Sequence, residues 1–247
     1  MSHDRPTVRM PDQLVGDESV EIGRIRAAYD ERDRQPARHR AITAAYRLVN
    51  ADRRARMQAM IERVSGDDRR ILDVGCGGGQ DLAYWLELGW PAERLAGVDL
   101  VARRVEQARQ HAPGVDVRVT SGSDLPFPDD SFDVVTAVTV FSSILEPDVR
   151  RRVFGELQRV VRPSGSVLVY DFVIRNPGNH DVVAMTTSHV NAMAGPPAES
   201  FRITPLIHLV AASTLLGDRA TAIAMRAAPR THRLWRWVGL LGASESS

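Results

Sequence analysis

The chain has 247 residues, 43% of them hydrophobic, and its 32 basic and 31 acidic residues leave a formal net charge of +1. This length predicts a single domain with room for an added lobe, and it suffices to bury a core without disulfides. A near-neutral charge argues against a dedicated nucleic-acid-binding protein, and no apolar run reaches transmembrane length. The single cysteine, Cys76, excludes internal disulfides, and with no signal-peptide core it predicts a cytoplasmic protein.

The N-terminal part of the chain divides into two segments. Residues 1–20 are polar and interrupted by proline, which predicts a flexible arm. Residues 21–66 are charged and rich in helix-forming residues, which predicts a helical cap that packs on the main domain and can cover an acceptor pocket. Arginine clusters occur at Arg53–Arg54, at Arg103–Arg104 and at Arg150–Arg152. We interpret each cluster as part of a solvated helix face.

The segment from Ile71 to Gln80 carries the strongest local pattern. A short apolar run, Ile71–Val74, predicts a buried strand, and four glycines follow it within five positions. Apolar residues at helical spacing begin after Gln80. A strand, a glycine loop and a helix in this order are typical of a nucleotide-binding α/β unit, because the backbone must turn sharply where a ligand approaches it.

The spacing of the glycines narrows the class of ligand. A dinucleotide loop has the pattern G-x-G-x-x-G, whereas this chain has the tighter pattern Gly75-x-Gly77-x-Gly79. Asp73 lies within the strand end, where its carboxylate would repel a phosphate-bearing cofactor. A dinucleotide-dependent oxidoreductase is therefore disfavoured, although a plain strand-to-helix turn would show the same glycines.

A second short strand is predicted over residues 95–99, and it ends on Asp99. This acid lies about twenty residues beyond the glycine loop, which is the separation that places a carboxylate at the tip of the second strand. A carboxylate there can accept hydrogen bonds from both ribose hydroxyls. The alternative is that Asp99 caps the helix predicted over residues 101–111.

The rest of the central region continues to alternate between strand and helix. Further strands are predicted over residues 115–119, 134–140 and 167–172, and an amphipathic helix is predicted over residues 149–161. A turn-rich loop, 121–133, follows the third strand. Alternation of this kind predicts a parallel sheet with right-handed crossovers.

These features together resemble the class I S-adenosylmethionine-dependent methyltransferases. The glycine loop resembles their motif I, Asp99 matches their ribose-binding acid, and Ser123-Asp124-Leu125 lies in a loop similar to the one that follows their third strand. The resemblance implies an α/β, Rossmann-like, doubly wound and mostly parallel seven-stranded sheet. It implies that Asp124 accepts the adenine amino group and Leu125 packs on the ring, unless Asp124 only stabilises a turn. The implied cofactor-binding residues are Asp73, Gly75, Cys76, Gly77, Gly79, Asp99, Leu100, Ser123, Asp124, Leu125, Val138 and Ser142.

Segments of residues 140–145, 170–172, 175–179 and 230–232 are similar to bacterial small-molecule methyltransferases, some of which act on sugars. A hydroxyl acceptor would need a nearby base. The candidates are Asp171, His189 and His232, with His208 as a further histidine; each could instead be structural. No cluster shows metal-ligand spacing, so no metal is expected.

The C-terminal part completes the predicted domain, which we place at residues 67–243. Residues 176–216 form an insertion predicted to cover the substrate, and the apolar helix within it, 206–216, is interpreted as a cavity wall or a dimer face. Residues 231–240 are predicted to form the closing antiparallel edge strand. The expected partners are S-adenosylmethionine and a small-molecule acceptor, without nucleic acid or membrane, and a homodimer is possible. Methylation of nitrogen or carbon, and cofactor binding without catalysis, remain alternatives to methylation of a hydroxyl.

Overall fold

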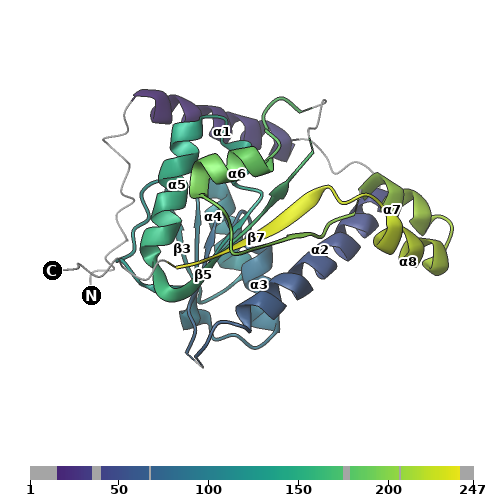
Figure 1. The fold of residues 1–247 in the computed structure, drawn as a ribbon, viewed down its shortest axis with the longest axis horizontal. Coiled ribbons are helices and arrows are strands. Elements are labelled where there is room, and N and C mark those ends of the chain that lie inside the picture. Colours follow the sequence, from purple (N-terminus) through teal and green to yellow (C-terminus); the bar gives the residue numbers. More distant parts are fainter. Residues whose placement is uncertain (1–15, 35–39, 67, 175–178, 206, 240–247) are drawn as a thin grey trace.

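The computed structural model describes residues 16–34, 40–66, 68–174, 179–205 and 207–239 (Figure 1). The strands are β1 (Ile71–Val74), β2 (Leu95–Asp99), β3 (Asp116–Val119), β4 (Phe132–Val138), β5 (Val161–Phe172), β6 (Glu199–Arg202) and β7 (His232–Val238). The helices are α1 (Gly16–Arg34), α2 (Arg40–Ile61), α3 (Gln80–Glu87), α4 (Ala102–His111), α5 (Pro147–Val160), α6 (Thr187–Ala194), α7 (Ile207–Thr214) and α8 (Asp218–Ala227). Two short 3-10 turns, η1 (Ala92–Arg94) and η2 (Phe141–Ser143), complete the described elements.

The seven strands form one sheet in the order β3-β2-β1-β4-β5-β7-β6. Strands β1 to β5 are parallel, and β7 runs antiparallel to both β5 and β6. The four residues of β1 are all buried, as expected for a strand that is covered on both faces. The predicted Rossmann-like, mostly parallel seven-stranded sheet is confirmed.

Helices cover both faces of the sheet, and each face has its own hydrophobic core (Figure 1). One core joins α5 and α6 to the sheet residues Leu72 and Val74. The other joins the end of α2, α3 and α4 to Ile71, which points to the opposite face. Neighbouring residues of one strand therefore belong to different cores, because side chains alternate across a sheet.

The N-terminal boundary differs from the prediction. Helix α1 begins at Gly16, within the segment predicted to be a flexible arm, while residues 1–15 lie outside the described part. The first turns of α1 are held by polar contacts to the main domain, since Glu18 and Glu21 are buried and have partners there. Such long-range contacts are invisible in the local sequence, where the same acids predict a solvated arm.

The predicted edge strand is also corrected. Strand β7 is an inner strand, because β6 pairs with it on the side away from β5 and forms the edge of the sheet. No strand was predicted within the insertion of residues 176–216. The side chains of β6 are mostly exposed, so its position depends on backbone pairing with β7 and leaves little hydrophobic pattern to detect.

The insertion after β5 packs into the fold. Helix α6 contacts α5, and its residues Val190 and Met193 belong to the core together with Met185. Helices α7 and α8 form a hairpin against the first half of α2, where Ala45 and Val210 are fully buried (Figure 1). No helix in the described part of the chain is both long and apolar enough to cross a membrane.

Candidate functional site

A cavity of about 400 Å³ opens at the carboxyl ends of β1, β2 and β4, where ligands of open α/β sheets bind. Helices α1 and α2 supply much of its cover, and none of the described residues of the insertion lines it. Residues of the loops after the first four strands complete the wall, including Asp73, Gly75, Cys76, Gly77, Asp99, Leu100, Ser121, Gly122, Ser123, Val138, Thr139 and Val140. We predicted that residues 21–66 and the insertion would both cover the pocket. In the structure, the N-terminal helices α1 and α2 cover it.

The glycine loop is shaped for close approach of a ligand. Gly75 has a φ of 72°, and an added Cβ there would lie 2.5 Å from Cγ2 of Val140. Gly79 has a φ of 79° and precedes α3, but it does not line the cavity. A Cβ at Gly79 would lie 2.7 Å from the Cα of Ala108, so this glycine permits α3 and α4 to pack closely.

Asp99 occupies the predicted position at the tip of β2 and lines the cavity. Its Oδ2 accepts a hydrogen bond from the Gly77 amide at 2.9 Å, and its Oδ1 accepts one from the Val101 amide at 2.8 Å. The carboxylate therefore joins the glycine loop to the start of α4. Each carboxylate oxygen has a second lone pair, so this structural role is compatible with binding of ribose hydroxyls.

Asp73 also lines the cavity, and its side chain is almost completely buried. The hydroxyl of Thr136 donates a hydrogen bond to Asp73 Oδ1 at 2.7 Å. Burial, and after it repulsion by Asp81, raises the pKa of Asp73 to about 7. A cationic ligand group beside Asp73 would favour the ionised form of this carboxylate.

The prediction of solvated arginine clusters is wrong for Arg53 and Arg150, which are both buried. Arg53 lines the cavity and donates a hydrogen bond to Asp81 Oδ1 at 2.8 Å, while its guanidinium lies 5.4 Å from the centre of the Tyr170 ring. Arg150 donates to the backbone carbonyl of Ile144 at 2.5 Å. The long aliphatic stem of arginine lets a helix place the guanidinium in the interior, where a carboxylate or a backbone carbonyl accepts its hydrogen bonds.

The structure separates the two residues predicted to bind adenine from the cavity. Asp124 is exposed and does not line it, and Leu125 is buried in the core beneath the loop. The cavity wall at this point is formed by Ser121, Gly122 and Ser123. Of the loop residues that we predicted, only Ser123 therefore faces the cavity, and Ser121 was missed because serines in a turn carry no distinctive signal.

Asp171, a predicted base, is fully buried at the end of β5 and does not line the cavity. Its carboxylate accepts hydrogen bonds from the amides of Ser142 and Phe172, each at 2.9 Å. Burial raises the pKa of Asp171 to about 6, and hydrogen bonds from Ser142 oppose that rise. Asp171 thus holds the turn after β4, and Ser142, predicted to bind the cofactor, takes part from inside the core.

The two predicted catalytic histidines also lie outside the cavity wall. The Nδ1 of His189 is 2.7 Å from the carbonyl oxygen of Ala184, on the insertion. His232 stacks on Tyr170 with ring centres 4.9 Å apart, and its Nδ1 is 2.8 Å from the Thr231 hydroxyl. Burial, and then the charge of Arg53, lowers the pKa of His232 to about 4, so the ring is neutral at pH 7. The side chain of His208 lies outside the described part.

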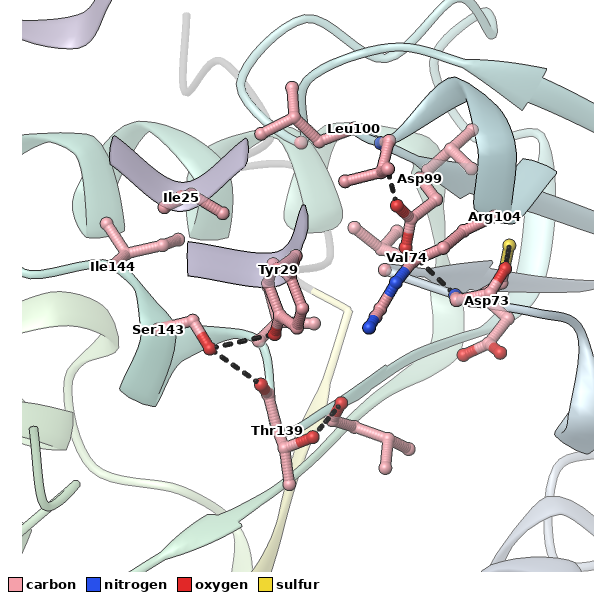
Figure 2. Close-up of a pocket in the computed structure, with 18 of the residues that line it drawn as sticks. Ile25, Tyr29, Asp73, Val74, Asp99, Leu100, Arg104, Thr139, Ser143 and Ile144 are labelled. Carbon is pink, nitrogen blue, oxygen red and sulfur yellow. Dashed lines mark hydrogen bonds between the residues drawn. The ribbon is translucent and has the colours of Figure 1, made fainter. Parts of the chain in front are cut away.

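Two hydroxyl groups that we did not predict as site groups, those of Tyr29 and Ser143, meet at the end of β4 (Figure 2). The Tyr29 hydroxyl, from α1, lies 3.0 Å from the Ser143 hydroxyl, which also contacts the carbonyl oxygen of Thr139. Thr139 has a φ of 55°, which is an unfavourable value for a β-branched residue. Arg104 lies over the Tyr29 ring at 4.2 Å. Only the tertiary structure brings these groups together.

The fold and the site now define a class of protein. A sheet in this strand order, with a glycine loop after β1 and an acid at the tip of β2, is the arrangement of class I S-adenosylmethionine-dependent methyltransferases. Residues 72–169 match the methyltransferase domain family. Residues 72–169 are therefore similar to a methyltransferase domain, and the cofactor that this similarity indicates is S-adenosylmethionine.

Known relatives share part of the chain. A demethylmenaquinone methyltransferase of Thermus thermophilus is 34% identical over 145 residues, which are 53% of this chain and 62% of the relative. An erythromycin 3″-O-methyltransferase of Saccharopolyspora erythraea is 31% identical over 139 residues, which are 53% of this chain and 44% of the relative. The chain thus matches less than two thirds of the length of these proteins.

A solved structure shows the same fold. The geranyl diphosphate C-methyltransferase from Streptomyces coelicolor A3(2), crystallised with S-adenosyl-L-homocysteine, superposes with a TM-score of 0.57 at 15% identity. The superposition covers 75% of this chain and 77% of that one. At this identity the likeness concerns the fold alone.

The residues of the cavity fit the cofactor. Gly75 lines the cavity without a Cβ, and Asp73 and Asp99 present carboxylates to it, which are hydrogen-bond acceptors of the kind that ammonium and ribose hydroxyl groups need. Within the described residues, no group of three or more His, Cys, Asp or Glu side chains could hold a metal ion.

Proposed function

We propose that the protein is an S-adenosylmethionine-dependent methyltransferase that transfers a methyl group to a hydroxyl of a small molecule, such as a sugar or another secondary metabolite. The matched methyltransferase domain and the relatives named above support methyl transfer to a small molecule. The choice of a hydroxyl acceptor depends on the composition of the cavity beside β4.

The observation that carries this choice is the pair of hydroxyls contributed by Tyr29 and Ser143, which lie 3.0 Å apart in the cavity wall. They lie next to the apolar side chains of Ile25 and Ile144, which line the same cavity (Figure 2). An acceptor that is apolar over most of its surface and carries a hydroxyl can bury its carbon skeleton here while its hydroxyl forms hydrogen bonds.

The cofactor, when bound, supplies a methyl group on a sulfonium that is its own leaving group. The protein therefore mainly holds the acceptor oxygen in line with that methyl. The new C–O bond forms as the C–S bond breaks, and the hydroxyl proton leaves to solvent. We assign this positioning to Tyr29 and Ser143, whose hydroxyls are 3.0 Å apart. Asp171, His189 and His232 stay candidates as bases only if the acceptor reaches beyond the cavity wall, since none of them lines it.

The test is an acceptor screen with methyl-labelled S-adenosylmethionine, in which mass spectrometry locates the transferred methyl. The panel contains alcohols, phenols, amines and activated carbon acids of similar size. We expect the label on oxygen, with Tyr29→Phe and Ser143→Ala lowering kcat/KM about 10–100-fold through lost positioning. The surface variant Tyr46→Phe is the matched control and should leave the rate unchanged. A label on nitrogen or carbon contradicts the proposed acceptor, and cofactor binding without transfer to any acceptor favours a non-catalytic binding protein.

A further inference from the structure

The adenine end of the cavity can be located from the order of the strands. The glycine loop follows β1, Asp99 follows β2, and residues 121–123 follow β3, which is the neighbour of β2 on the side away from β1. A cofactor with its amino acid at the glycine loop and its ribose at Asp99 must therefore extend its base toward residues 121–123. The apolar side chains of Val149 and Val153 line this part of the cavity.

Adenine carries a 6-amino group, which donates hydrogen bonds, so the protein must present an acceptor to it. The loop after β3 contributes no acidic side chain to the cavity, because Asp124 points to solvent. The polar side chains that it does contribute are Thr120, Ser121 and Ser123, and the Thr120 hydroxyl donates to the backbone carbonyl of Asp124 at 2.8 Å. A serine hydroxyl can donate or accept, and so it selects an amino group only if its own proton is engaged elsewhere.

A buried acid on α1 engages that proton. Glu18 is 5% exposed, and its Oε1 accepts a hydrogen bond from the Ser123 hydroxyl. The other oxygen, Oε2, lies 3.1 Å from the guanidinium of Arg152. The Ser121 and Ser123 hydroxyl oxygens are 2.8 Å apart. A chain of hydrogen bonds thus runs from the Ser121 hydroxyl in the cavity wall through the Ser123 hydroxyl to the Glu18 carboxylate.

The directions of the protons in this chain follow from counting them. An ionised carboxylate only accepts, so the single proton of Ser123 is directed to Glu18. Ser123 then has no proton for Ser121, and the hydrogen bond between the two serines must be donated by Ser121. Both hydroxyl protons consequently point toward Glu18, and the oxygen of Ser121 offers only lone pairs to the cavity.

We propose that Glu18 makes the Ser121 hydroxyl an obligatory acceptor and thereby selects a 6-amino purine over a 6-oxo purine in the cofactor. Glu18 is a positioning residue that acts through Ser123 and Ser121. The selection rests on S-adenosylmethionine as the cofactor of the proposed function. It also gives α1 a second role, since the helix that covers the cavity carries the group that orients the adenine contact.

The test compares two ligands that differ at this one position, S-adenosylhomocysteine and its deaminated analogue S-inosylhomocysteine, by titration calorimetry on the full chain. The wild type should bind the adenosyl ligand about tenfold or more tightly than the inosyl ligand. The 6-oxo group of the inosyl ligand is a hydrogen-bond acceptor, and it would face the Ser121 oxygen, which also only accepts. In Glu18→Gln, Arg152 can only donate, so it fixes the amide oxygen and turns the amide nitrogen toward Ser123. The proton chain then reverses, and the preference should fall to about one or invert.

Two further variants keep the interpretation clear. Ser121→Ala removes the last hydroxyl without touching α1 and should abolish the preference. Asp124→Asn, the matched control with an exposed acid in the same loop, should leave it intact. Hydrogen exchange of the α1 amides verifies that the helix stays docked in Glu18→Gln. The inference is overturned if Glu18→Gln and Ser121→Ala still bind the adenosyl ligand and keep the wild-type preference for it over the inosyl ligand. It is also overturned if Asp124→Asn loses that preference. Failure of the wild type to bind either ligand overturns the proposed function as well.

Discussion

Arg53 and Arg54 offer a matched comparison, because both guanidinium groups bind the same carboxylate oxygen. Arg53 Nη2 lies 2.8 Å and Arg54 Nε lies 2.7 Å from Asp81 Oδ1. Their surroundings differ, since the Arg53 side chain is 5% exposed and that of Arg54 is 24% exposed. The distances alone predict equal contributions to stability, whereas burial predicts very unequal ones.

The expected loss of unfolding free energy depends on whether the charge that remains after each substitution is buried or solvated. Asp81→Ala strands the Arg53 charge, whose other side-chain partner is the Met57 sulfur at 3.2 Å and whose Nε already has no partner. Loss of one member of such a buried pair costs about 3–5 kcal/mol in the free energy of unfolding. Arg54→Met removes a partly solvated charge, and exposed pairs of this kind contribute less than about 1 kcal/mol.

The assay is urea unfolding of the apo protein followed by circular dichroism. Because a domain has only about 5–15 kcal/mol of stability, Asp81→Ala is studied beside the double variant Arg53→Met/Asp81→Leu, which removes both buried charges. We expect the double variant to unfold within about 2 kcal/mol of the wild type. If Asp81→Ala and Arg54→Met lose similar amounts, or if the double variant is no more stable than Asp81→Ala, burial is not what decides the energetics of this pair.

Four further predictions concern the cofactor cavity. Asp99→Asn should weaken S-adenosylhomocysteine binding by about 2 kcal/mol, or roughly thirtyfold, through loss of charge-assisted hydrogen bonds, and equal calorimetric affinities would place the ribose elsewhere. Because the folded-state pKa of Asp73 is raised to about 7, its ionised form is scarce below that pH; cofactor affinity should rise as pH increases from 6 to 8, and Asp73→Asn should flatten the curve. The same raised pKa means that Asp73 contributes stability below its unfolded value near 4 and that this contribution is lost as pH rises toward 7, which urea midpoints of wild type and Asp73→Asn can measure. Gly75→Ala should cost about 1–2 kcal/mol for the left-handed backbone and more for the clash with Val140; Val140→Ala should restore only the clash part, and full restoration would contradict the backbone argument.

The central part of the fold could be predicted because short local sequence patterns indicate each of its elements. The strand at Ile71–Val74, the glycines after it and the acid at Asp99 are each recognisable within a few residues. Their order along the chain fixes their order at the sheet edge, since parallel strands present all their carboxyl ends on one side. The cofactor class followed from these positions without any knowledge of packing.

The failures have a common physical cause, which is that burial and partnership are set by residues distant in sequence. Arg53 is charged and lies in a charged helix, yet Asp81, 28 positions further along, makes it an interior residue. The acids at the start of α1 likewise find partners more than 100 positions away, as Glu18 does in Ser123. Edge strand β6 has no apolar pattern because its side chains face solvent, and only pairing with β7 reveals it.

The sequence by itself therefore determined the parallel part of the sheet, the glycine loop after β1 and the acid at the tip of β2. Only the tertiary structure decided that Asp124 faces solvent and that Asp171 serves the turn after β4. It alone brought Tyr29 to the end of β4, because a hydrogen bond between residues 114 positions apart leaves no periodic trace. A turn acid has the same local sequence whether it faces a ligand or water, and the choice between the two is made by the helix that packs above it.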